Sequence, residues 1–168
     1  MSDINELKDT VNLKTPYFVL FSIITCGIYL ILWLQRNYPV IDRITGQKTA
    51  DAKYILWLAI GLGCTLVLAE PPDNFILFLI VALLQLNYWI LTIFWSFKAR
   101  SALQAYALVT HKIDLRMNVV WTFLFHFFYI NYCINDLAEV KRKQDILFGK
   151  ISGMNPGTQN NPEQEMPQ

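Results

Sequence analysis

The stretch SIITCGIYLILWLQRN, residues 22–37, decides the class of this protein because it is almost wholly apolar and yet holds a glycine in its middle. Thr25 lies two residues before Gly27, and Arg36 is the first charged residue after it. Such a pattern is compatible with a buried helix of a soluble domain, a helix that crosses a bilayer, or a membrane segment with a break at the glycine. The rest of the chain separates the soluble from the membrane interpretations.

Four stretches of the sequence contain no Asp, Glu, Lys or Arg: residues 15–35, 54–69, 74–97 and 117–135, which are 21, 16, 24 and 19 residues long. A helix that crosses the hydrocarbon core needs about 20 apolar residues. The chain is 54% hydrophobic and only 16% charged, whereas about 25% is charged in soluble domains. We therefore predict an all-α, polytopic integral membrane protein with four membrane-embedded helices.

Prolines and a capping residue mark where these helices end and begin. Pro39 is expected to end the first helix, because proline cannot donate an intrahelical hydrogen bond. Pro71 and Pro72 separate the second helix from the third, and Asp73 or Asn74 can cap the third helix. The short connection predicts that the second and third helices form a tight hairpin.

The chain divides into three parts in this interpretation. Residues 1–14 form a polar N-terminal tail, residues 15–150 the membrane helical domain, and residues 151–168 a disordered C-terminal tail without apolar periodicity. The third and fourth helices have no stop signal at the membrane edge. We expect them to extend into charged cytoplasmic segments, residues 98–116 and 136–150.

The distribution of basic residues leaves two topologies open. Cytoplasmic loops favour Lys and Arg, and four full spans would leave 8 of the 14 basic residues inside and 6 outside. If only the second and third helices span, while the first and fourth enter and leave on the cytoplasmic side, all 14 are inside. A break at Gly27 would permit that fold-back. Close packing at Gly27 is the alternative, and four spans are the default prediction.

Polar side chains inside the apolar stretches repeat at helical spacing. An unpaired polar group in hydrocarbon is costly, so these residues should face one another or a cavity. We expect hydrogen bonds between helices, and the alternative is a polar pathway. The candidates are Thr25, Tyr29, Gln85, Tyr88, Thr92, His126, Asn131 and Asn135.

Small residues indicate close helix packing. Ala59 and Gly63 are spaced as a small-x-x-x-small pair in the second helix, and Gly61 lies between them. Such faces let another helix approach closely. Together with Gly27 they predict packing within the protomer, or alternatively a homo-oligomer contact.

Several activities lack any motif in the sequence. His126 has no acidic neighbour and no second histidine in helical reach, and the three cysteines show no metal or redox spacing. An intramembrane enzyme would need His126 and Cys133 to converge on one pocket. We therefore predict no enzymatic activity, no cofactor and no metal. The net charge of +1 argues against a nucleic-acid partner.

Two elements resemble those of a known family. The stretch at 24–33 is similar to an I-T-x-G-I-Y-x-x-x-W element, and the stretch at 125–135 to a Y-x-x-Y-x-I-N element preceded by Phe125. Both are typical of small bacterial inner-membrane proteins of unknown function. The resemblance implies a multi-pass protein of the bacterial inner membrane and supplies no activity, substrate or cofactor.

These observations favour a non-enzymatic membrane protein that works by association. Its partners would be the lipid bilayer and a second copy of the chain or another membrane or cytoplasmic protein. The alternative is a small transport or channel-like protein with a polar path between the first, third and fourth helices. A continuous cavity lined by Gln85, Tyr88, Thr92 and Asn131 would favour transport.

Overall fold

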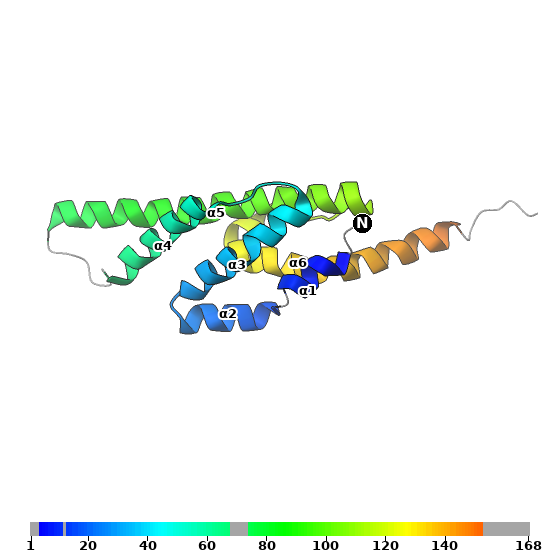
Figure 1. The fold of residues 1–168 in the computed structure, drawn as a ribbon, viewed down its shortest axis with the longest axis horizontal. Coiled ribbons are helices and arrows are strands. Elements are labelled where there is room, and N and C mark those ends of the chain that lie inside the picture. Colours follow the sequence, from blue (N-terminus) through cyan, green and yellow to red (C-terminus); the bar gives the residue numbers. More distant parts are fainter. Residues whose placement is uncertain (1–3, 12, 68–73, 153–168) are drawn as a thin grey trace, which may run out of the picture.

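The computed structural model describes residues 4–11, 13–67 and 74–152, and every element within them is a helix (Figure 1). One of these helices is long and apolar enough to cross a membrane. In chain order the elements are α1 (Ile4–Val11), α2 (Thr15–Ile24), α3 (Ile28–Thr45), α4 (Ala52–Val67), α5 (Phe75–His111) and α6 (Val119–Ser152).

The first predicted helix is two helices, α2 and α3, joined by a sharp turn. Cys26 and Gly27 have φ angles of 49° and 89°, in the left-handed region that glycine adopts without steric cost. The Thr25 hydroxyl donates to the Phe21 carbonyl at 2.8 Å and accepts from the Tyr29 amide at 3.0 Å, which ties the two helices together. The default prediction of an unbroken helix is wrong, and the alternative of a break at Gly27 is correct.

Pro39 lies inside α3 rather than at its end, so the predicted boundary is wrong. A proline removes one intrahelical hydrogen bond, and the other turns of this 18-residue helix hold it together. The helix stops instead at Gly46, whose φ of 68° is left-handed. Glycine is common at this position because it adopts that conformation freely.

Helices α4 and α5 lie side by side (Figure 1). Helix α5 has 37 residues and continues from the third apolar stretch into the charged segment, as the sequence predicted. Asn74 caps it by accepting hydrogen bonds from the amides of Ile76 and Leu77. Tyr54 of α4 donates to the carbonyl of Leu91 in α5. The predicted hairpin connection, residues 68–73 with both prolines, lies outside the described residues.

Helix α6 bends sharply at His126, where φ and ψ are 38° and −112°. The Tyr129 hydroxyl accepts a hydrogen bond from the Asn118 amide at 2.9 Å. In a straight helix these residues would be about 16 Å apart along the axis, further than a tyrosine reaches. The segment before His126 therefore folds back towards the segment after it, a feature that the sequence analysis missed.

The region predicted as a polar tail contains the helix α1, in which Leu7 and Val11 are buried. It packs against α6 and α3. The predicted disordered tail lies outside the described residues from residue 153 onwards, and α6 itself continues to Ser152.

Buried and exposed apolar side chains concentrate in different parts of the molecule. Most of the core lies among α1, α3, the later half of α5 and α6 after its bend, and includes Trp33, Leu34, Trp95, Leu103, Ile130 and Leu137. Large apolar side chains are exposed mainly on α2, the start of α3, α4, the first half of α5 and the start of α6.

Candidate functional site

The predicted polar residues of α5 bond within their own helix or to α4. The Thr65 hydroxyl bonds to the side-chain amide of Gln85. Thr92 donates to the Tyr88 carbonyl at 2.8 Å, in the same helix. The first of these bonds joins α4 to α5, and the second stays within α5.

The two predicted asparagines of α6 hold a different contact. Asn131 is fully buried, and its Nδ2 donates to the Leu13 carbonyl at 3.0 Å and to the Thr15 hydroxyl at 3.1 Å. Asn135 donates to the same Leu13 carbonyl at 2.9 Å. These hydrogen bonds hold the link between α1 and α2 against α6.

The first and last apolar stretches also contact each other directly. The ring of Phe18 in α2 lies 5.0 Å from that of Phe128 in α6. Thr25 and Tyr29 instead bond to each other across the turn between α2 and α3.

His126 and Cys133 do not converge on one pocket. The His126 ring lies 5.9 Å from the Trp89 ring of α5 and 6.4 Å from the Phe123 ring. Cys133 lines a separate pocket with Asp114 and Asp136. No group of three His, Cys, Asp or Glu side chains within the described residues could hold a metal.

The small residues divide into two groups. A Cβ atom at Gly61 would lie 3.0 Å from the Cβ of Tyr88, so this glycine permits close packing of α4 on α5 within the protomer. A Cβ at Gly63 would have nothing within 4 Å, and one at Gly27 would lie 3.4 Å from Leu62. Gly63 and Ala59 line an open groove instead.

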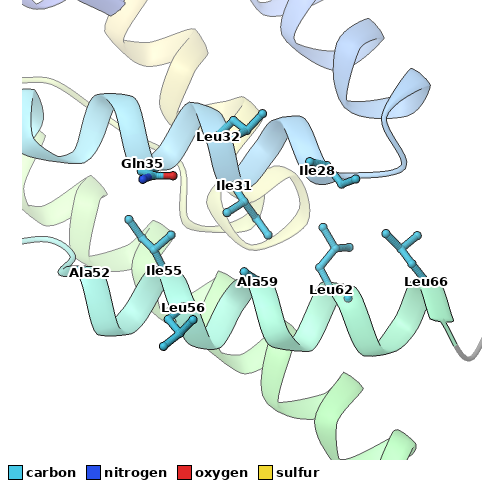
Figure 2. Close-up of a pocket in the computed structure, with 11 residues that line it drawn as sticks. Ile28, Ile31, Leu32, Gln35, Ala52, Ile55, Leu56, Ala59, Leu62 and Leu66 are labelled. Carbon is cyan, nitrogen blue, oxygen red and sulfur yellow. The ribbon is translucent and has the colours of Figure 1, made fainter.

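That groove, which we call the α3/α4 groove, is an apolar cavity of about 500 Å³ between these two helices. Figure 2 shows Gln35 and Ala52 near one of its ends and Ile28 and Leu66 near the other. Among the described residues that line the groove, Gln35 is the one whose side chain has polar atoms. The groove is therefore apolar along its length and polar at one end.

A second cavity of about 250 Å³ lies on the neighbouring face of α3, and we call it the Arg36 pocket. Its polar lining residues are Tyr29, Trp33, Arg36 and Asn37. It shares Leu32 with the α3/α4 groove, so the two cavities meet on one helix.

Two residues that line the Arg36 pocket are themselves buried, and each has one polar side-chain atom without a hydrogen-bond partner in the described part of the chain. Trp33 is 3% exposed and Asn37 is 2% exposed. The Asn37 Nδ2 donates to the Trp33 carbonyl at 2.8 Å. The Asn37 Oδ1 and the Trp33 Nε1 have no hydrogen bond to any described residue. Such buried orphan atoms are uncommon in native structures.

The sequence analysis did not single out Trp33, Arg36 and Asn37 as site residues. Their spacing carried a usable signal, since Tyr29, Trp33, Arg36 and Asn37 follow one another along α3 within two turns. This spacing identifies a pocket only when the orientation of α3 against α1 is known, and that orientation depends on the turn at Gly27.

Charged pairs outside the apolar stretches are exposed. The Lys143 ammonium lies 2.9 Å from the Glu139 carboxylate, one turn along α6, and this cation lowers the pKa of Glu139. Asp114, 2.9 Å from Arg116, raises the pKa of that guanidinium. Both pairs keep their charges at neutral pH and are screened by water.

Comparison with known proteins gives one match. Residues 13–105, more than half of the chain, match a family model described as a domain of unknown function, DUF4234. The region covers the first of the two quoted elements, and the second, at 125–135, lies beyond it. No curated protein and no solved structure matches the chain.

Proposed function

Since the chain belongs to the DUF4234 family, a domain of unknown function, we infer its role from geometry and propose a non-enzymatic membrane protein that works by association. In this proposal α4 and α5 cross the bilayer as a hairpin. The first and last apolar stretches are also membrane-embedded, but each enters and leaves on the same side. This makes four embedded segments and two spans.

The observation that carries the proposal is that both of these stretches break near their middles. Helix α2 has 10 residues, which is about 15 Å, or half of the roughly 30 Å hydrocarbon core. The start of α6 before His126 is shorter still. Neither can cross, so each returns at its break, at Gly27 and at His126.

Side-chain exposure supports the same arrangement. Ile23 and Ile24 at the end of α2 are 70% and 66% exposed, and Phe75 at the start of α5 is 75% exposed. Large apolar patches on a soluble protein rarely exceed a few hundred Å². Lipid would cover this surface without any further protein.

The basic residues agree with two spans. All 14 lie outside the four uncharged stretches, and in this topology they all face the cytoplasm, as the charge rule favours. The link between α4 and α5 contributes no basic residue to the opposite side. Together with the quoted sequence resemblance, this supports a multi-pass protein of the bacterial inner membrane.

The later part of α6 supports the idea of association. It projects beyond the other helices (Figure 1), and Ile146 and Leu147 are 53% and 60% exposed. Exposed apolar residues next to Arg142 and Lys143 form a surface that a cytoplasmic partner protein can cover.

The transport alternative has less support. Gln85 bonds to α4, while Asn131 bonds to the link between α1 and α2. Thr92 bonds to its own helix. The side chains that would line a path are thus paired separately. The separation of His126 from Cys133 similarly favours a non-enzymatic role.

Single-cysteine labelling tests the topology. In a chain without its native cysteines, we would introduce Ser2→Cys, Gln47→Cys, Asn74→Cys and Gln168→Cys in turn. Two spans predict that positions 2, 47 and 168 react from the cytoplasmic side and position 74 from the other. Four spans predict that position 47 reacts from the side opposite position 2, and that result would overturn the proposal.

Site-specific cross-linking tests the association. A photoreactive residue at Leu147 should trap a protein partner in intact membranes, and one at Val109, an exposed position on α5, should not. Replacing Ile146 with Asp should abolish the cross-link at Leu147. Equal cross-linking at both positions, or none at either, would contradict a specific partner surface.

A further inference from the structure

We propose that the Arg36 pocket and the α3/α4 groove together form a binding site for one anionic phospholipid. The headgroup phosphate lies against Arg36, and an acyl chain runs over Leu32 into the groove. The inference rests on the proposed membrane location, and it adds a ligand that neither the fold nor the family description assigns.

The chemistry of the Arg36 pocket fits a phosphodiester headgroup. Arg36 is exposed, and no ion pair with another described residue neutralises it. A guanidinium binds phosphate oxygens through paired, charge-assisted hydrogen bonds. Tyr29 and Asn37 line the same pocket, so Arg36 has polar neighbours on the side where the headgroup would lie.

The position of Arg36 along α3 fits the headgroup layer. It is the first charged residue after the uncharged stretch 15–35. From the turn at Gly27, α3 rises towards the cytoplasmic side, so Leu32 lies about one turn deeper than Arg36. A lipid held at Arg36 would extend its chain past Leu32 towards Ile28, which is the direction of the groove.

The length and lining of the groove suit an acyl chain. From Ala52 to Leu66 the α4 wall is about 21 Å long, which accommodates a chain that reaches through half of the roughly 30 Å hydrocarbon core. The lining is apolar except for Gln35 at the polar end, which matches an amphipathic ligand.

Native mass spectrometry of the full chain, purified in mild detergent and supplied with phosphatidylglycerol or phosphatidylcholine, tests the site. The wild-type chain should retain one phosphatidylglycerol in preference to phosphatidylcholine. Arg36→Gln should weaken retention of phosphatidylglycerol about tenfold or more, because a hydrogen bond to a charged group is lost. Lys112→Gln, the same charge change at an exposed position, should retain it as the wild type does.

Groove-filling variants test the acyl-chain half of the site. Ala59→Phe and Gly63→Leu place bulk inside the groove, and both should abolish retention. Ala82→Phe adds the same bulk on exposed α5 and serves as the control. Circular dichroism and the thermal midpoint confirm that each variant is folded. Because a Cβ at Gly63 meets nothing within 4 Å, the second variant covers the case in which Ala59→Phe fails to fold.

Three results would overturn this inference. The first is equal lipid retention by Arg36→Gln, Gly63→Leu and the wild type. The second is a lipid-free dimer, which would mean that a second copy fills the groove. The third is binding of inorganic phosphate as tight as that of phosphatidylglycerol, which would mean that the acyl chain contributes nothing to the affinity. If cysteine labelling shows the proposed membrane topology but the chain retains no lipid, the lipid site is refuted and the proposed function is not.

Discussion

The two halves of α5 are one continuous helix in two different environments. Between Phe75 and Phe94 its large apolar side chains are mostly exposed, whereas Trp95 and Leu103 are 0% and 1% exposed. The first half has bulky side chains on every face, and the second alternates small or apolar residues with charged and amide ones. Helical periodicity, and not apolar content, therefore separates the half of α5 that packs into the protein core from the half whose apolar side chains are exposed.

The largest expected effect is a cavity in the second half. Leu103→Ala should lower the free energy of unfolding by about 2–5 kcal/mol, because it removes a buried side chain without refilling the space. Leu83→Ala, at a position 58% exposed in the first half, should change it by about 0.5 kcal/mol or less. Thermal or denaturant unfolding in mild detergent measures both. Equal losses would mean that the first half is covered by protein.

A charge in the first half should affect membrane insertion instead of core packing. Leu86→Lys should cost about 2.5–3.5 kcal/mol, the cost of a lysine near the centre of a spanning helix. Leu108→Lys is the control, since Leu108 is similarly exposed but lies beyond the apolar stretch. The measurement is the fraction of chain recovered in alkali-washed membranes. If Leu86→Lys inserts as well as Leu108→Lys, the first half of α5 does not lie in lipid.

Packing of α4 on the first half of α5 gives a smaller effect. Gly61→Ala should destabilise the chain by up to about 2 kcal/mol, because the new methyl group would lie 3.0 Å from the Tyr88 Cβ and this crowding outweighs the gain in helix propensity. Gly63→Ala has open space and should be neutral or stabilising by up to about 1 kcal/mol, through helix propensity. Unfolding midpoints of the two variants in the same detergent compare them directly. A loss at Gly63 equal to that at Gly61 would argue against the packing described.

The sequence predicted the features that depend on local chemistry. The length of α5 and its cap at Asn74 follow from an unbroken run of helix formers after a capping residue. The continuation of α6 into its charged segment was predicted for the same reason. Gly27 was recognised as a candidate break because glycine is unfavourable inside a helix by about 1 kcal/mol.

Other features depend on tertiary contacts that one sequence does not contain. The turn at His126 has no glycine or proline to announce it, and it coincides with contacts to Trp89 and the Asn118–Tyr129 hydrogen bond. Helix α1 was missed because its two buried residues, Leu7 and Val11, lie in a mostly polar segment. The Arg36 pocket depends on both helix α1 and the turn that orients α3, so it could not be assembled from residue spacing alone.

The smallest expected effect concerns where the exposed half of α5 begins. Asn74→Ala should destabilise the chain by about 1 kcal/mol, because the amides of Ile76 and Leu77 lose the side-chain oxygen that they bond. Asn74→Asp keeps that oxygen and should change stability by about a few tenths of a kcal/mol at most. The loss should appear as earlier amide hydrogen exchange in the first turns of α5 and should leave exchange around Leu103 unchanged. Faster exchange at both places would mean that the two halves of α5 unfold together. The two halves would then differ in what surrounds their side chains but not in their local stability.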